Sequence, residues 1–303
     1  MAERIRLVEV GPRDGLQNER TPVSVATRIE FIERLIAAGL TTIEAGSFVS
    51  EKRVPQMAGS AEVLRAVLPR SDCEFHVLVP NEQGLAAAQA AGAKVVAVFA
   101  SASETFSRRN INCSIAESIE RFRPVLARAK AAGIRVRGYV SCVLGCPYEG
   151  EVSVAAVVRV ARMLWDEGCY EISLGDTIGV GTPGKARAML RAVAQAVPLE
   201  HLALHCHDTY GQALANILAG LEEGVRAIDC SAGGLGGCPY APGATGNVAT
   251  EDVVYMCEGM GLATGVDLDR LVEATNWITL QLRRAPASRV AAALMAKRAV
   301  TLS

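Results

Sequence analysis

A repeated unit decides the fold of this chain, and one copy reads Val154-Ala-Ala-Val-Val-Arg-Val-Ala-Arg-Met-Leu-Trp-Asp-Glu-Gly-Cys-Tyr-Glu-Ile-Ser-Leu174. Apolar residues recur through 154–167 with the 3.6-residue period of an amphipathic helix. Gly168 then stands where a helix commonly ends in a left-handed residue. The apolar run 171–174 that follows is short enough to be a buried strand. The stretch therefore predicts a helix that packs back against a parallel strand.

The same unit recurs along the chain at a spacing of roughly 30 residues, the size of one strand–helix repeat. A second clear helix spans 24–38 and is closed by Gly39, and further helices are closed by Gly92, Gly133 and Gly224. Eight short apolar runs predict strands, at 5–10, 42–45, 74–79, 94–100, 136–141, 171–174, 202–207 and 227–230. Eight such repeats without a linker predict an α/β fold, a closed (β/α)8 TIM barrel. An open doubly wound sheet usually needs a glycine-rich first turn, and residues 11–15 do not supply its fingerprint.

We expect one catalytic domain over residues 1–303, because a barrel of this kind occupies that length as a single unit. The barrel itself is predicted at about 4–260. Additional C-terminal helices are expected at about 261–303, where they cover one end of the barrel or make an oligomer contact.

The net charge, the length of the apolar runs and the cysteine count limit which partners and compartments we expect. The formal net charge is -1 and no basic stripe is visible, so we expect no nucleic-acid partner. No apolar run reaches the roughly 18 residues that a membrane span needs. The nine cysteines are odd in number and scattered, which favours reduced thiols in a cytoplasmic protein. Because the first strand is predicted to begin near residue 5, we expect no targeting segment.

Polar residues gather directly after the predicted strands. In a TIM barrel the carboxyl ends of all eight strands meet at one mouth, and the active site lies there. We therefore expect a common site for the residues that follow the first, second, fourth, sixth, seventh and eighth strands: Arg13, Asp14, Gln17, Glu44, Ser47, Ser101, Ser103, Glu104, Arg108, Arg109, Asn110, Asp176, Thr177, His205, His207, Cys238 and Asn247.

Two of the four histidines predict a metal site. His205 and His207 are two residues apart on one strand, so their imidazoles point to the same face. Together with carboxylate and amide oxygens they form a mixed nitrogen and oxygen site, which suits Mg²⁺ or Mn²⁺. The alternative is a pair of hydrogen-bonded histidines at the surface.

Other candidates also have ordinary structural explanations. Asp14 fits a turn residue paired with Arg13, and Asn247 fits the N-cap of a following helix. Glu44 is harder to explain in this way, because a carboxylate in an apolar strand is costly unless it is paired. We expect Arg13, one strand away, to be its partner.

The segment 230–247 holds six glycines, two prolines and the thiol of Cys238. So much glycine is entropically costly to order, which favours a mobile element that carries a reactive group. Cys238 is alternatively an inert small residue, since most free cysteines are unreactive. Arg108 and Arg109 fit equally well on a solvated helix face.

Three motifs give the chain a family resemblance. The opening stretch reads Val8-Glu-Val-Gly-Pro-Arg-Asp-Gly-Leu-Gln-Asn-Glu19, and the fourth-strand segment runs from Ser101-Ala-Ser-Glu104 to Asn110-Ile-Asn-Cys-Ser114. The third motif is Gly234-Leu-Gly-Gly-Cys-Pro-Tyr240. In these motifs, and over most of the chain to about Gly259, the sequence resembles the 3-hydroxy-3-methylglutaryl-CoA lyase family.

The resemblance implies cleavage of 3-hydroxy-3-methylglutaryl-CoA to acetyl-CoA and acetoacetate, as in leucine degradation and ketone-body formation. It also implies an acyl-CoA substrate, a divalent cation and a homodimer. Its metal ligands would be Asp14, His205, His207 and Asn247. Its catalytic residues would be Arg13 at the thioester carbonyl, Glu44 orienting Arg13, Asp14 or His205 as the base, Asp176 arranging the site, and the thiol of Cys238. Substrate contacts are expected from Arg13, Gln17, Ser47, Arg108, Arg109 and Asn110.

Three alternatives remain at this point. One is a lyase for a longer branched 3-hydroxyglutaryl-CoA thioester, since pocket depth cannot be read from these motifs. Another is a Claisen-type acyl-CoA synthase, although such enzymes usually carry a further C-terminal domain. The third is a non-catalytic scaffold, against which a complete set of metal ligands argues.

Overall fold

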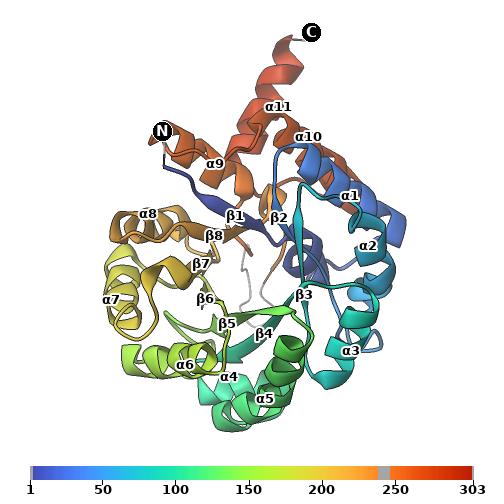
Figure 1. Ribbon diagram of the computed structural model, residues 1–303. Helices are drawn as coiled ribbons and strands as arrows, with labels where there is room; N and C mark the ends of the chain where they lie inside the picture. Colours follow the sequence, from blue (N-terminus) through green and yellow to red (C-terminus); the bar gives the residue numbers. More distant parts are fainter. Residues whose placement is uncertain (1–2, 238–245, 302–303) are drawn as a thin grey trace.

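The computed structural model describes residues 3–237 and 246–301, and eight parallel strands in it close into a barrel in chain order (Figure 1). Strand β8 pairs with β1, with Leu7 opposite Ile228 and Glu9 opposite Cys230. The eight strands are β1 (Arg6–Glu9), β2 (Thr42–Ser47), β3 (Glu74–Leu78), β4 (Val95–Ser101), β5 (Arg135–Ser141), β6 (Glu171–Asp176), β7 (Leu202–Cys206) and β8 (Ala227–Cys230). The predicted (β/α)8 TIM barrel is confirmed.

Helices surround the barrel as an outer ring (Figure 1). The first six are α1 (Val25–Ala37), α2 (Ser60–Val67), α3 (Glu82–Ala90), α4 (Glu104–Ile111), α5 (Ile115–Ala131) and α6 (Val154–Asp166). The others are α7 (Pro183–Val193), α8 (Ala213–Glu223), α9 (Thr250–Gly259), α10 (Leu268–Leu282) and α11 (Arg289–Thr301). Short helical turns lie at η1 (Gly11–Gly15), η2 (Pro55–Met57), η3 (Leu199–His201) and η4 (Ala232–Gly234).

Helix α6 shows how the sequence pattern builds the ring. Its buried residues follow the spacing of one helix face, and each buried valine or leucine among them contributes about 1.5–3 kcal/mol. The hydroxyl of Ser153 accepts the N–H of Ala156 and so caps the first turn. Gly168 ends the helical segment at φ +98°, a conformation that glycine adopts without a Cβ clash. The residues buried on α6 are Val157, Val160, Ala161 and Leu164.

The C-terminal helices extend the ring. Helix α10 packs against α1, beside the start of the barrel, and α11 packs on α9 and α10. Figure 1 shows α11 standing out from the body of the molecule. At the other end of the chain, Arg4 forms a parallel bridge with Ala263, which joins the N-terminus to the segment before α10. Within the described ranges, no helix is long and apolar enough to span a bilayer.

Candidate active site

A cavity of about 710 Å³ opens at the carboxyl ends of the strands. Its lining comes from the segments that follow β1, β2, β3, β6, β7 and β8, from the ends of β3, β4, β5, β6 and β7, and from helices α4 and α5. The polar residues among them include Arg13, Asp14, Gln17, Asn110, Arg121, Tyr139, Thr177, His205 and His207. The apolar wall includes Leu78, Phe99, Phe106 and Phe122. Polar groups from distant parts of the chain therefore face one common cavity.

The π-helical turn η1 carries Arg13 and Asp14 into this cavity. The N–H of Gly15 donates to the carbonyl of Val10 at 3.2 Å, the wider i to i−5 contact of a π-turn. A Cβ on Gly15 would lie 2.8 Å from the Cβ of Leu235, so this turn can pack against the segment after η4 only with glycine here. Such turns are frequent at functional sites.

Arg13 is held rigidly by two carboxylates. Its Nε donates to Glu44 Oε2 at 2.6 Å, and one terminal nitrogen donates to Asp14 Oδ1 at 2.6 Å. Glu44 is fully buried, so the predicted pairing with Arg13 supplies the partner that its charge needs. Burial acts to lower the pKa of Arg13, but the charges of Glu44 and Asp14 outweigh it and raise that pKa. The guanidinium is therefore a fixed positive charge beside the cavity.

The metal-ligand candidates lie together. One donor atom from each of Asp14, His205 and His207 falls within 4.8 Å of the others. His205 Nε2 lies 4.0 Å from Asp14 Oδ2, and the two imidazole centroids are 5.3 Å apart. The carboxamide of Asn247 donates to Asp14 Oδ2 at 2.9 Å. Rotation of that carboxamide would present its oxygen at the same place.

The protonation states of these side chains suit the binding of a metal cation. Burial acts to raise the pKa of Asp14, but the positive charges of Arg13 and the histidines lower it to about 2. Burial lowers the pKa of His207 to about 4, and the nearby His205 adds to this effect. At neutral pH a carboxylate and a neutral imidazole are therefore available, which are the forms that bind metals.

His207 shows most clearly whether these residues suit a bound metal ion. Its Nδ1 is buried and has no hydrogen-bond partner among the described residues. An unsatisfied buried nitrogen is costly unless a ligand engages it. Both histidines are buried, at 8% exposed for His205 and 6% for His207, so the alternative of a surface pair is wrong. The mixed nitrogen and oxygen donors fit a divalent metal ion.

Asn247 is not a helix cap. Helix α9 begins at Thr250 and its N-cap position is Ala249. Asn247 instead forms an antiparallel bridge with His207 and also donates to the carbonyl of Leu235 at 3.2 Å. The strand-like pairing holds its side chain against Asp14.

Other predicted site residues fall into two groups. Gln17 and Asn110 line the cavity, whereas Ser47 is buried outside its lining. The carboxylate of Asp176 accepts backbone N–H groups from Val180 at 3.2 Å and Gly181 at 2.9 Å. Asp176 thus braces the loop after β6 and does not belong to the donor cluster.

The two arginines after β4 also lie away from the cavity lining. Ser103 caps α4, and both Arg108 and Arg109 are exposed in the last turn of this helix. The guanidinium of Arg109 stacks over the ring of Tyr148 at 4.3 Å. The solvated helix face is therefore the better description of this pair. Cys238 lies outside the described residues.

Three buried polar residues were not predicted: Tyr139 lines the cavity, and Arg137 and Asp229 lie behind it. Tyr139 of β5 packs edge-on to His205, with ring centroids 6.1 Å apart. Below it, Arg137 and Asp229 form a fully buried ion pair at 2.7 Å. Arg137 and Asp229 could have been predicted from the sequence. Each is a charged residue inside an apolar strand, in β5 and β8, and so needs a partner just as Glu44 does.

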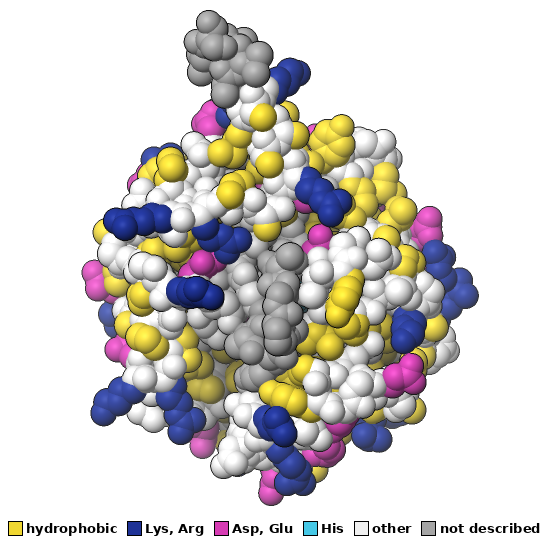
Figure 2. Space-filling model, turned by 180° about the vertical axis from the view of Figure 1, so that it is seen from behind, with side chains coloured by type: hydrophobic (Ala, Val, Ile, Leu, Met, Phe, Trp, Pro, Cys, Tyr) yellow, Lys and Arg dark blue, Asp and Glu magenta, His cyan; other side chains and the backbone are white. Residues whose placement is uncertain are grey.

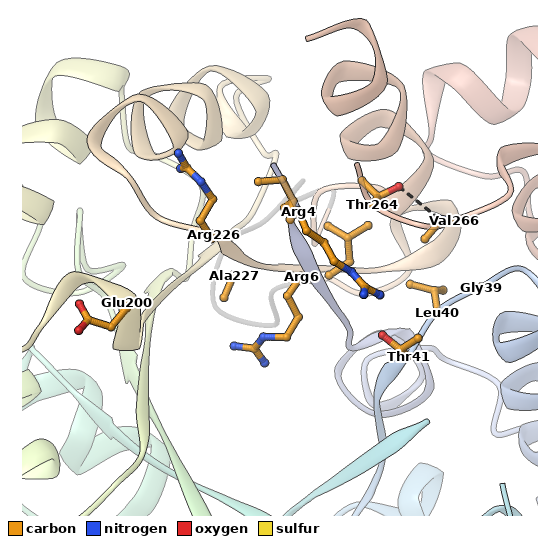
Figure 3. A pocket seen from close by; sticks show the side chains of 12 residues that line it. Arg4, Arg6, Gly39, Leu40, Thr41, Glu200, Arg226, Ala227, Thr264 and Val266 are labelled. Atoms are coloured by element: carbon orange, nitrogen blue, oxygen red, sulfur yellow. Dashed lines mark hydrogen bonds between the residues drawn. The ribbon is translucent and has the colours of Figure 1, made fainter. Parts of the chain in front are cut away.

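A second cavity of about 460 Å³ lies at the opposite, amino end of the barrel (Figure 3). Arg4, Arg6 and Arg226 contribute to its lining, but Figure 3 shows their side chains pointing in different directions. Arg6 also pairs with Glu171, and Arg226 pairs with Glu3 at 2.7 Å. These charges do not converge on a common point, so the carboxyl-end cavity is the candidate active site.

Comparisons with known proteins agree on one family. The HMGL-like family model matches residues 4–278. A Pseudomonas aeruginosa 3-hydroxy-3-isohexenylglutaryl-CoA/hydroxymethylglutaryl-CoA lyase is 58% identical, over 98% of this chain and 99% of that protein. A crystal structure of hydroxymethylglutaryl-CoA lyase from Pseudomonas aeruginosa, also 58% identical, covers the same shares with a TM-score of 0.96. An Acinetobacter baumannii HMG-CoA lyase in complex with coenzyme A and 3-methylmalate is 36% identical, with a TM-score of 0.91, over 96% of this chain and 95% of that one.

Proposed function

This chain belongs to the HMGL-like family of hydroxymethylglutaryl-CoA lyases and cleaves 3-hydroxy-3-methylglutaryl-CoA, and from that premise we propose how its own residues do so. The reaction breaks a carbon–carbon bond and yields acetyl-CoA and acetoacetate. The curated relatives are named for this activity and not for a Claisen-type synthase, and the Pseudomonas aeruginosa relative is named for the longer isohexenyl thioester as well. The observation that carries the mechanism is the cluster of Asp14, His205 and His207 beside Arg13 in one cavity.

The proposed ion is Mg²⁺ or Mn²⁺, held by Asp14, His205, His207 and Asn247. Support comes from the separation of the first three donors, from the partnerless Nδ1 of His207 and from the oxygen and nitrogen donor set. When bound, such an ion would lower the pKa of the tertiary hydroxyl of the substrate, so that even a weak base can take its proton.

Asp14 is the proposed base, and geometry favours it over His205. His205 turns Nδ1 toward Asp229, at 3.3 Å, and presents only Nε2 to the cluster. A nitrogen engaged by an ion has no lone pair left for a proton. Asp14 has two oxygens, so one can hold the ion while the other accepts the proton of the hydroxyl. With a pKa of about 2, its carboxylate is ionised at neutral pH.

Arg13 is the proposed stabiliser of the enolate that cleavage leaves on the acetyl-CoA carbonyl. Glu44 and Asp14 engage two of its nitrogens, and the third remains for a substrate oxygen. Because the guanidinium is already fixed, it need not reorganise as the charge develops. Loss of one preorganised donor of this kind costs roughly 3–4 kcal/mol in transition-state stabilisation. The final proton on the enolate carbon is proposed to come from Cys238 or from a water that it holds.

Binding of an acyl-CoA is supported by the Acinetobacter baumannii relative, which is named as a complex with coenzyme A. The 3-hydroxy-3-methylglutaryl end is proposed to lie at the donor cluster, with Gln17 and Asn110 along its path to solvent. Ser47, Arg108 and Arg109 have no place in the cavity lining to support substrate contact. Asp176 is proposed to act on the site only through the loop that it braces.

A homodimer in the cytoplasm is the proposed state of the protein. Helix α11 stands out from the body, and Figure 2 shows hydrophobic side chains along it. Leu294 and Met295 of this helix are half-buried, while Tyr255 of α9 is 63% exposed. The eight cysteines in the described part of the chain are all free thiols, which supports a reducing compartment. Light scattering on the purified protein tests the dimer.

The role of Arg13 is tested by Arg13→Ala, with Arg109→Ala as the matched loss of an exposed arginine. We expect Arg13→Ala to lower kcat/KM by roughly 10²- to 10³-fold while Mn²⁺ binding persists. Arg109→Ala should retain turnover within a few-fold. Near-normal turnover of Arg13→Ala would remove Arg13 from the mechanism.

A further inference from the structure

Asp229 faces the side of His205 that is turned away from the cavity. The two residues are opposite one another in the register of β7 and β8. His205 Nδ1 lies 3.3 Å from Asp229 Oδ2, while Nε2 of the same ring lies 4.0 Å from Asp14 Oδ2. The imidazole is thus placed between a carboxylate inside the barrel and the donor cluster at its mouth.

Asp229 is held as an acceptor. Arg137 donates to both of its oxygens, at 2.7 Å and 3.0 Å, and the hydroxyl of Ser173 donates to Oδ2 at 2.8 Å. All of these groups are buried, and Arg137 and Asp229 are at most 1% exposed. A carboxylate that receives three donated hydrogen bonds is ionised and can only accept. The contact with His205 therefore requires the proton on Nδ1.

The charge of Asp229 is fixed by a longer row of ion pairs. Arg137 Nε donates to Glu171 Oε1 at 2.7 Å, and Glu171 Oε2 pairs with Arg6 at the amino-end cavity (Figure 3). Two guanidinium groups thus alternate with two carboxylates from β1 to β8. The row carries no net charge and ends at His205. It therefore fills the barrel interior and also orients the imidazole of His205.

We propose that Asp229 is a positioning residue, which holds His205 as the Nδ1–H tautomer and so keeps the Nε2 lone pair directed at the ion. The proposal rests on the proposed metal ligands. Partners behind a metal-binding histidine typically change metal affinity by 10- to 100-fold when they are replaced. Asp229 would thus set the affinity of the site without touching ion or substrate.

The tautomer is measured first, in the unaltered protein without added metal. With only four histidines in the chain, ¹⁵N-histidine labelling and long-range ¹H–¹⁵N correlation resolve each ring, and single substitutions of His76, His201 and His207 assign His205. We expect a protonated Nδ1 and a bare Nε2 on His205. A protonated Nε2 would overturn the proposal, whatever the enzyme activity is.

The second measurement compares Mn²⁺ affinity in Asp229→Asn and Glu171→Gln by calorimetry. Both changes neutralise one carboxylate that pairs with Arg137, but only Asp229→Asn alters the contact with His205. We expect a 10- to 100-fold weaker Kd for Asp229→Asn and a change below threefold for Glu171→Gln. Equal losses in both variants would show that the row is merely structural and would refute the proposal.

The two measurements separate this proposal from the metal site itself. If the unaltered protein does not bind Mn²⁺, the proposed ligands fail even where the Nδ1–H tautomer is found. If Mn²⁺ binds but the tautomer differs, only the role of Asp229 fails. If Asp229→Asn does not fold, Ser173→Ala is used instead, because it removes one of the hydrogen bonds donated to Asp229 Oδ2. In Ser173→Ala we expect His205 to remain the Nδ1–H tautomer, since Arg137 still holds the carboxylate of Asp229. Loss of that tautomer in Ser173→Ala would contradict the argument.

Discussion

Replacement of Glu9 by glutamine should make the stability of the barrel less sensitive to pH. Glu9 lies at the end of β1, fully buried, and holds the start of η4 by accepting the N–H of Ala232 at 3.0 Å. It also accepts from Gly11 at 2.8 Å and from the hydroxyl of Thr250 at 2.7 Å. Burial raises the pKa of Glu9 from 4.5 to about 7, although these hydrogen bonds act to lower it.

The sign and size of the effect follow from linkage. The folded protein binds the proton of Glu9 more tightly than the unfolded chain, so the stabilising contribution is full below about pH 4.5. It is lost as the pH rises toward 7 and is absent above that. One pKa unit corresponds to about 1.4 kcal/mol, so the raised pKa predicts a loss of about 3 kcal/mol over this interval. Glutamine keeps an acceptor oxygen and carries no charge, which removes this part of the pH dependence.

The assay is denaturant unfolding at pH 5, 6, 7 and 8, with the free energy of unfolding plotted against pH. Glu9→Gln should show a profile flatter than that of the unaltered protein by about 3 kcal/mol across the range. Glu251 is a second buried carboxyl, with a pKa raised by burial to about 7, and Glu251→Gln should flatten the profile similarly. Glu258→Gln, at an exposed position of α9, is the matched control and should leave the profile unchanged. A Glu9→Gln profile parallel to that of the unaltered protein would show that Glu9 does not titrate with a raised pKa in the folded state.

Further predictions concern the cavity. His207→Ala should lower the amount of Mn²⁺ retained after gel filtration, as measured by elemental analysis, because the partnerless Nδ1 is removed, and full occupancy would exclude ligation. Cys238→Ser should lower turnover without changing Mn²⁺ content, and alkylation should inactivate the protein unless substrate protects it; normal turnover after complete labelling would make the thiol a bystander. Gly15→Ala should impair both turnover and stability, since its Cβ would lie 2.8 Å from Leu235, and wild-type values of both would show that η1 tolerates a side chain.

The barrel could be predicted from sequence because its two signals are local. A strand buried on both faces reads as an apolar run, and a helix that packs on it reads as a 3.6-residue period closed by glycine. Strand β8, predicted at 227–230, has those bounds in the structure. Strand β6 continues two residues beyond the predicted 171–174, because Gly175 and Asp176 still pair with β7.

The site was less predictable, because position after a strand does not tell where a side chain points. Asp176 follows the rule of strand ends, yet its carboxylate turns to the backbone of the next loop. Arg109 follows β4 closely, yet the helix that Ser103 caps directs it to solvent and to Tyr148. The partners Arg137 and Asp229 are 92 residues apart, and only barrel closure brings them together. Glu44 and Arg13 could be paired from the sequence because a buried carboxylate must have a cation nearby.

Metal-dependent cleavage is measured by acetoacetate formation from 3-hydroxy-3-methylglutaryl-CoA with Mg²⁺ or Mn²⁺ under thiol reductant, and again with EDTA. We expect acetoacetate in the presence of the ion, its loss with EDTA, and its return when the ion is restored in excess. Product formation unaffected by EDTA, in protein shown by elemental analysis to be free of metal, would contradict the role assigned to Asp14, His205, His207 and Asn247.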